Sequence, residues 1–326
     1  MADINCKITL SVPALEKFVE ILCKGIGRWY SPIDVRRMAK AKACEISVIS
    51  EALRENADVP AVYDNGEIVL DTQNFGELMK RAHQRMTYQE LVKQNNIESV
   101  IGMAYQAIGN EEKVTDEPVD EDWILRFFNS VQDVSSAEMQ RIWAGILAGE
   151  IRRPSSFSLR TLETLHNISK DEAELFQRIH KYIIKNGKKR YIPNEDVLLQ
   201  NAGINYSDIV RLEECGLINA DSNLAIQHEE VHHMSLAHNN KYVVFATAKN
   251  KFYLKVRVFP LTRVGCEIES LFNTDTEYKF LVLFAQEMRK KYPSIDIKMH
   301  PIKSINENII EYDERIDLLS DDETIG

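Results

Sequence analysis

Residues 75–108 constrain the fold of this chain more than any other part of the sequence, because they predict a single long amphipathic helix. Residues 32–57, rich in Ala, Lys, Arg and Glu, predict a second long helix, and residues 13–29 a shorter one that Pro13 opens. Helices of this length cannot bury their apolar stripes alone. Residues 1–109 are therefore predicted as a long-helix oligomerisation region, and the protein as a homo-oligomer.

The negative charge is concentrated in two short runs and does not identify a partner. The formal net charge is -10, and residues 111–122 and 307–326 hold the acidic excess. Both runs are typical of solvated segments, so residues 110–122 are predicted as an acidic linker and residues 306–326 as an acidic tail. The overall acidity of the chain therefore says little about what it binds.

Hydropathy and cysteine spacing exclude several classes of protein. The chain is 44% hydrophobic, yet no apolar run reaches membrane-spanning length and the first residues lack the pattern of a signal peptide. We expect a cytoplasmic protein without a membrane span. The five cysteines stand far apart and form no C-x-x-C pair, so neither a disulfide framework nor a cysteine-rich zinc site is expected.

Residues 123–168 are predicted as a compact helical module. Apolar residues at helical spacing, among them Trp143 and Leu159, form its expected core. Gly149 and Pro154 mark the turn between its second and third helices.

Three sequence runs in and around this module carry a resemblance to a known family. P-V-D-E-D-W-I-L-R-F-F (118–128), M-Q-R-I-W-A-G-I-L-A-G-E-I (139–151) and P-S-S-F-S-L-R-T-L-E-T-L (154–165) resemble a bacterial family described as a domain of unknown function. The likeness extends upstream to residues 25–32 and downstream to residues 260–268. Genes of that family occur near phage-defence and other mobile-element loci, so the resemblance implies a role in antiviral defence. It implies no activity, cofactor or catalytic residue.

Basic side chains in the N-terminal half could hold an acidic or phosphorylated partner. A solvated helix face, or pairing with the acidic linker, is the alternative for each of them. The residues proposed for such an interaction are Lys24, Arg28, Arg36, Arg37, Arg152, Arg153 and Arg160.

Residues 169–227 show the order of elements found in a winged helix: helix, short strand, helix, helix and a possible strand pair. Nucleic-acid binding would follow, but the expected recognition helix, residues 205–215, holds three acids against Arg211. Phosphate neutralisation requires the opposite charge. The segment is therefore predicted as winged-helix-like, with protein packing favoured over nucleic-acid binding.

Residues 228–238, H-E-E-V-H-H-M-S-L-A-H, contain the pattern of a zinc hydrolase. On a helix, His228 and His232 would lie one turn apart and hold zinc, while Glu229 would polarise the bound water. His238 has the spacing of a third ligand in the longer form of this pattern.

The context of this pattern argues against catalysis. Ser235 replaces the glycine that turns the chain in the longer pattern, and the segment lies between extended stretches. Residues 228–241 are therefore predicted as a His-rich surface connection, with adventitious metal binding and catalytic zinc as alternatives.

The C-terminal part is predicted as a small α+β domain, residues 242–305. Residues 242–248 and 252–259 are rich in β-branched and aromatic residues and predict a hairpin that turns at Lys249–Lys251. The motifs of a P-loop, a dinucleotide-binding loop and a nucleophile elbow are absent from the sequence.

Together these patterns predict a mainly α protein with a smaller α+β part: long N-terminal helices, a central helical module, a winged-helix-like segment and a C-terminal α+β domain. The expected function is non-enzymatic: the protein binds other macromolecules, such as a protein partner, and associates with itself in antiviral defence. No catalytic residue, cofactor or metal is predicted. The alternatives are a nucleic-acid-binding winged helix and a zinc-dependent hydrolase.

Overall fold

The computed structural model describes residues 13–26, 62–64, 67–69, 76–108, 117–272, 275–306 and 309–319. The predicted helix of residues 32–57 and most of the predicted acidic linker lie outside the described residues. The chain divides into two compact units, Met1–His166 and Asn167–Gly326, and each is described by itself.

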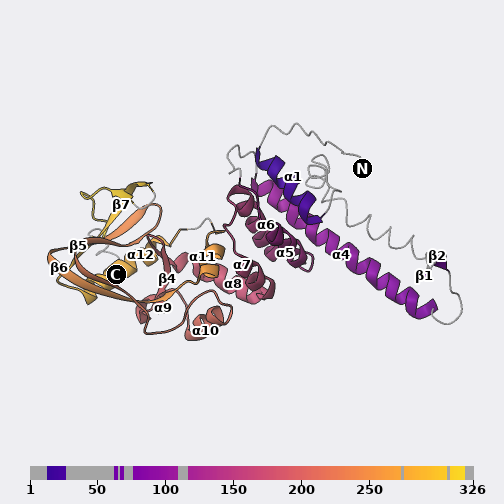
Figure 1. Ribbon diagram of the computed structural model, residues 1–326. Coiled ribbons are helices and arrows are strands. Elements are labelled where there is room, and N and C mark those ends of the chain that lie inside the picture. The colour runs from indigo at the N-terminus through magenta and orange to yellow at the C-terminus, as the bar shows by residue number, and fades with distance from the viewer. Residues whose placement is uncertain are drawn as a thin grey trace. The chain divides into compact units, whose positions relative to one another are not determined.

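The described part of the N-terminal unit consists of helices and one short strand pair (Figure 1). Its elements are α1 (Pro13–Ile26), β1 (Val62–Asp64), β2 (Glu67–Val69), α4 (Gly76–Ile108), α5 (Glu121–Val131), α6 (Ala137–Arg152) and α7 (Leu159–Asn167). The prediction of one helix for residues 75–108 is confirmed by α4, which packs on α6 and α5. No helix in the described ranges is both long and apolar enough to cross a membrane.

Aromatic packing forms the centre of this unit. Trp143 is fully buried, and its ring meets that of Phe127 edge-on with the centroids 5.5 Å apart. Phe127 in turn stacks on Trp123, at the start of α5, where the Asp120 side chain accepts a hydrogen bond from the Trp123 backbone N–H. The prediction that Trp143 belongs to the core is confirmed. Leu159, predicted beside it, is 37% exposed.

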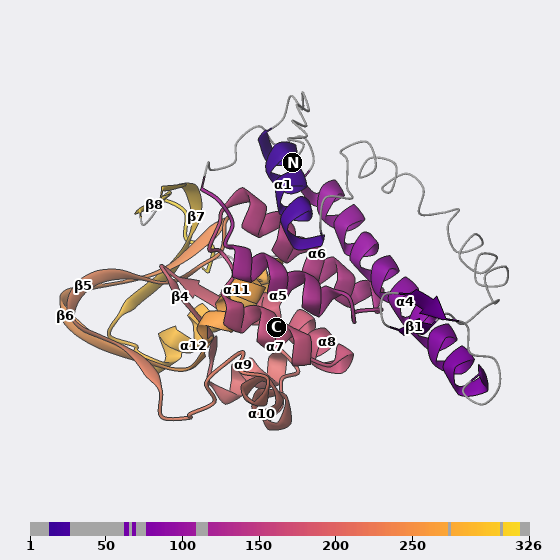
Figure 2. The same ribbon diagram turned by 45° about the vertical axis from the view of Figure 1, so that its right-hand side comes forward.

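The C-terminal unit combines helices with a curved antiparallel sheet (Figure 2). Its helices are α8 (Lys170–Ile179), the short 3-10 helix η1 (His180–Tyr182), α9 (Asp196–Asn201), α10 (Tyr206–Glu214), α11 (Arg263–Glu269) and α12 (Tyr278–Lys291). Its strands are β3 (Ile184–Asn186), β4 (Lys189–Pro193), β5 (Ala225–His238), β6 (Tyr242–Pro260), β7 (Asp296–Asn306) and β8 (Ile309–Tyr312).

The sheet closes on itself. The strand order is β4-β3-β5-β6-β7-β8, and β4 also pairs with β6, so that β4, β3, β5 and β6 form a closed ring. The ring is joined where Lys185 on β3 pairs with His238 on β5, and where Tyr191 on β4 pairs with Pro260 on β6. α12 packs on β7.

The predicted fold class is wrong: the protein has an α+β fold and is not mainly α. The sheet is larger than expected because β5 occupies residues that were predicted as a polar connection. Register shifts between His228 and Val231, and between Val231 and His233, interrupt the alternation by which a strand is recognised in sequence.

β6 also differs from the prediction. The expected hairpin turn at Lys249–Lys251 lies inside one 19-residue strand, where the pairing with β5 jumps from Thr247 to Phe252. The true hairpin partner of β6 is β5, and the two strands run side by side (Figure 2). Three polar residues in an apolar run indicate a turn locally, but they also fit an irregularity in a strand whose partner comes from elsewhere in the chain.

Part of the predicted acidic tail belongs to the C-terminal unit. β8 pairs with β7, and Leu319 is 1% exposed. Asp317 accepts a hydrogen bond from the Arg289 guanidinium at 2.9 Å, which ties the segment to α12. Burial of Leu319 and this ion pair together hold the segment against the sheet.

Candidate functional site

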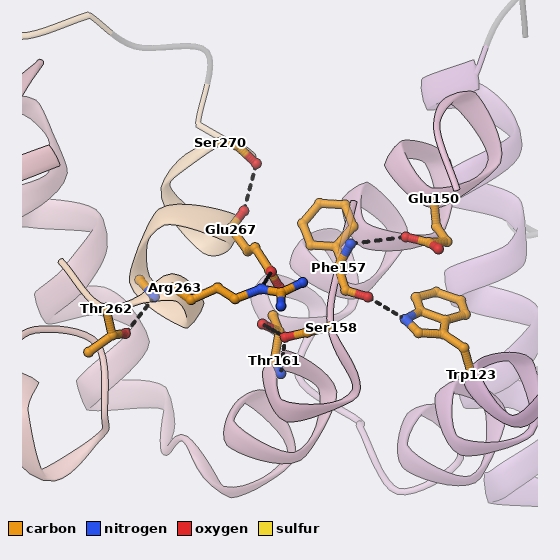
Figure 3. Close-up of polar contacts among 10 residues, drawn as sticks. Trp123, Glu150, Phe157, Ser158, Thr161, Thr262, Arg263, Glu267 and Ser270 are labelled. Atoms are coloured by element: carbon orange, nitrogen blue, oxygen red, sulfur yellow. Dashed lines mark hydrogen bonds and ion pairs between the residues drawn. The ribbon is translucent and has the colours of Figure 1, made fainter. Parts of the chain in front are cut away.

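Side chains from the three sequence runs that resemble a known family hold the loop between α6 and α7 in place. The Glu150 carboxylate, 1% exposed, accepts hydrogen bonds from the backbone N–H groups of Ser155 (2.6 Å) and Phe157 (3.0 Å), as Figure 3 shows for Phe157. The Trp123 indole donates to the Phe157 carbonyl at 2.8 Å. The Phe157 ring lies against Gly149, where an added Cβ would come within 2.6 Å of it. These contacts give the residues a packing role.

Four of the basic residues proposed for an interaction lie in the described part of the chain. Lys24 forms ion pairs with Glu20 (3.0 Å) and Glu121 (3.5 Å), and the hydrogen bond to Glu20 raises its pKa. Arg152 donates to the Ala107 carbonyl at the end of α4. Arg153 and Arg160 are exposed, and Arg28, Arg36 and Arg37 lie outside the described residues.

The histidine pattern lies on an extended strand. Four residues of a strand span roughly 13 Å, against about 6 Å along a helix, so the backbones of His228 and His232 are too far apart for the helical zinc geometry. Burial lowers the pKa of His238, and the charges of Arg190 and Lys185 lower it further. Among the described side chains no group of three metal-binding residues could hold an ion. This arrangement does not fit a zinc hydrolase.

We expect purified protein to retain far less than stoichiometric zinc after mild chelation, because the strand separates the two histidines. Glu229→Gln and His232→Ala should both keep the thermal midpoint and the molecular mass of the wild type. Elemental analysis checks the metal content. Stoichiometric zinc that disappears only in His232→Ala would contradict this expectation.

The basic residues nearest the ring closure are engaged in a buried ion cluster. Glu269 on α11 is 5% exposed and lies 3.3 Å from the Lys185 ammonium and 3.8 Å from the Arg190 guanidinium. One carboxylate thus links α11 to β3 and β4, and this gives Lys185 and Arg190 a structural role. Lys188 and Lys189, at the turn between these strands, are exposed.

The outward face of α10 is acidic. Asp208 forms an ion pair with Arg178 at 3.1 Å and completes a capping box with Asn205. The exposed charges that remain on the helix are Arg211, Glu213 and Glu214. Such a face does not neutralise phosphates.

A basic and aromatic stripe covers the outer face of β6. Between residues 251 and 258 the strand alternates strictly, with Phe252, Leu254, Val256 and Val258 buried. On the opposite face Tyr253 is 49% exposed, and cationic side chains flank it. We name this surface, together with one lysine from the end of α12, the β6 patch: Lys251, Tyr253, Lys255, Arg257 and Lys291.

A single carboxylate organises part of the β6 patch. Glu195, just before α9, lies 3.4 Å from the Arg257 guanidinium and 2.6 Å from the Lys291 ammonium. The Tyr292 hydroxyl donates to the Lys255 carbonyl and accepts from the Lys255 backbone N–H, so the end of α12 is fastened to the edge of β6. The cations are therefore held together by contacts among three elements.

The first half of α4 presents a second exposed surface. From Asn96 onward the helix is largely buried against α5 and α6, but Met79, Met86 and Tyr88 are 37%, 60% and 58% exposed. Figure 1 shows this half of α4 extending beyond the helices that cover the other half. A hollow of about 310 Å³ beside it is lined by Tyr88, Val92, Asn96, Gln132 and Ser135, among others.

A comparison with known families places the chain. The model of a family described as a protein of unknown function, DUF2806, matches residues 80–284, which is more than half of the chain. The chain belongs to the DUF2806 family. No curated protein and no solved structure matches it.

The DUF2806 match begins in α4 and ends in α12, so it includes Met86, Tyr88 and the β6 strand of the patch. Lys24 and the upstream run at residues 25–32 lie outside it. The prediction of a family of unknown function is confirmed, whereas its link to phage defence stays a prediction.

Sequence reasoning missed the β6 patch. The signal was present in F-Y-L-K-V-R-V-F (252–259), where Tyr253, Lys255 and Arg257 occupy alternate positions. The same run was used to predict a strand, but its polar face was not considered as a surface. Lys291 could not have been added, because its proximity to Arg257 depends on the fold.

Proposed function

We propose that this protein acts without catalysis of its own, by binding other macromolecules and by associating with itself through the first half of α4. The observation that carries the proposal is the exposure of Met79, Met86 and Tyr88 on a helix whose other half is buried. A helix of 33 residues is about 50 Å long, so the exposed half offers a substantial surface.

The spacing of the apolar residues fits a second helix as the occupant of this surface. Met79, Ala82 and Met86 stand at positions i, i+3 and i+7, which lie on one face of a helix and form the seam of a coiled coil. A second copy of the chain presents the same seam, so two copies can cover each other symmetrically. Contact that removes large exposed apolar side chains from water lowers the free energy of the associated state.

A charge placed in this seam should break the association. For Met86→Glu we expect light scattering at micromolar concentration to show the mass of a monomer, whereas the wild type gives a multiple of it, because a carboxylate is costly to bury between helices. Gln84→Glu adds the same charge to an exposed position outside the seam and serves as the control, which should keep the wild-type mass. A wild-type protein that is monomeric under these conditions would refute the proposal.

Nucleic-acid binding by the C-terminal unit is the second candidate. It is supported by the order of α8, β4, α9, α10, β5 and β6 along the chain, and by the pairing of both β4 and β5 with β6, which resemble a winged helix apart from the additional strand β3. The acidic face of α10 would repel the phosphates of a duplex, so this helix is not expected to bind in its major groove. The cations of the β6 patch favour a different contact.

A role in antiviral defence is the biological setting that we propose for this binding. The resemblance of the central runs to a family found near phage-defence loci supports it. Plaque counts on cells with and without the intact gene test it, and Met86→Glu should abolish any protection if self-association is required.

A further inference from the structure

We propose that the β6 patch binds single-stranded nucleic acid, with its cations on the phosphates and Tyr253 stacked on a base. This inference rests on the proposed function, because it names one class of macromolecule that the protein binds. Its first support is geometric. Lys251, Tyr253, Lys255 and Arg257 occupy alternate positions of one strand, and their exposed sides share one face.

Charge is the second support. From Lys249 to Pro260 the strand contains cations and no acid. Lys291 joins them through Glu195, whose carboxylate lies between Lys291 and Arg257 and holds both in place. Glu229 and Glu230 lie on β5 in the irregular pairing opposite this stretch, and their side chains are outside the described residues. Among the described side chains, Arg257 and Lys291 share the one Glu195 carboxylate and Lys255 adds a further cation, so this surface carries more positive than negative charge and attracts a polyanion.

The exposed tyrosine distinguishes a nucleic acid from other polyanions. Tyr253 is 49% exposed although it lies in the middle of a strand, with a lysine two positions away on each side. Proteins that bind single strands combine cations along the backbone with aromatic rings on which unpaired bases stack. A membrane surface would instead require several apolar side chains. On this face the residues on either side of Tyr253, at positions 251, 255 and 257, are all cationic.

A single strand suits this surface better than a duplex. Same-face residues on a strand are roughly 6.6 Å apart, so the cations of β6 form a line along which a flexible phosphate backbone can run. Bases of a duplex are stacked on each other and cannot stack on Tyr253. The usual route to a duplex, a basic helix in the major groove, is closed by Glu213 and Glu214 on α10.

Fluorescence anisotropy with a labelled oligothymidylate of roughly 20 nucleotides, long enough to span several sites of the usual size, tests the proposal. We expect saturable binding by the full chain, weakened roughly tenfold in Tyr253→Ala through loss of stacking. In Lys255→Gln/Arg257→Gln the slope of log K against log salt should fall by about 1.4, for two lost phosphate contacts. Tyr206→Ala, which removes a 79% exposed tyrosine from α10, and Lys188→Gln are the controls and should bind like the wild type.

Several outcomes would overturn the inference: no binding by the wild type, equal loss in the control variants, or tighter binding of a duplex of the same length. Binding to phosphatidylserine vesicles that the patch variants abolish, without binding to the oligonucleotide, would assign the surface to membranes instead. The thermal midpoint of each variant must match the wild type. Light scattering on the same samples separates this inference from the proposed function. An oligomer that does not bind the oligonucleotide would reject only the nucleic-acid-binding role of the β6 patch.

Discussion

Replacing Trp143 by alanine is expected to lower the free energy of unfolding of the N-terminal unit by about 3–5 kcal/mol. Trp143 is fully buried on α6, and its ring meets that of Phe127 edge-on. Removal of the indole would leave a cavity beside Phe127, and close-packed helices relax only partly into such a space. Among the described residues the Trp143 indole N–H has no hydrogen-bond partner, so the loss is one of packing.

Tryptophan fluorescence during chemical denaturation measures this change, because Trp29, Trp123 and Trp143 all belong to the N-terminal unit. The variant keeps two of the three reporters. Leu125→Ala is the matched control: Leu125 lies on α5 and is 49% exposed, so its truncation should alter stability by no more than about 0.5 kcal/mol. An unchanged unfolding curve combined with lost self-association would make Trp143 a contact residue and not a core residue.

Replacing Gly265 by alanine is expected to destabilise the C-terminal unit by about 3 kcal/mol, the upper end of the usual cost of overpacking. An added Cβ would come within 2.0 Å of the Leu217 carbonyl oxygen. That oxygen accepts a hydrogen bond from the Thr262 backbone N–H at 2.9 Å, so it cannot move away freely. Thr262 also caps α11: its hydroxyl, drawn in Figure 3, accepts a bond from the Gly265 backbone N–H. The same hydroxyl donates a hydrogen bond to the Gly216 carbonyl.

The loss should be seen by far-ultraviolet circular dichroism and not by tryptophan emission, since the C-terminal unit contains no tryptophan. Gly102→Ala is the control for the chemistry of the change. Gly102 is also helical, but nothing lies within 4 Å of an added Cβ, so alanine there should be neutral or stabilising by up to about 1 kcal/mol. Wild-type stability in Gly265→Ala would show that α11 can shift away from Leu217.

The exposed half of α4 and the β6 patch differ in how far they could be predicted from the sequence. Met79, Ala82 and Met86 follow helical spacing inside a helix that was predicted correctly, so their common face could be foreseen. Their exposure could not, because it depends on where α5 and α6 end along α4. For the β6 patch the alternation of Tyr253 and Arg257 was readable, but the contribution of Lys291 required the end of α12 to meet β6.

The histidine pattern shows why a short motif does not decide a local structure. H-E-x-x-H carries its zinc chemistry only on a helix, where the two histidines share a face one turn apart. Here β6 supplies backbone partners along residues 225–238, and extended pairing separates His228 from His232. Pairing of this kind involves residues distant in the sequence and is invisible to a local pattern.

By itself the sequence determined elements whose signal is local: the helix of residues 76–108, the helix α5, and the apolar helical face that includes Trp143. Helical hydrogen bonds and caps join residues three or four positions apart, so their signal lies within one short window. Only the tertiary structure decided the extent of β5 and β6, the closure of the ring through Lys185 and His238, and the gathering of the cations beside Tyr253. Each of these depends on backbone pairing or side-chain contacts between segments far apart in the chain. Which segments pair is decided by the fold as a whole, because nearly every buried backbone N–H and C=O group must find a hydrogen-bond partner.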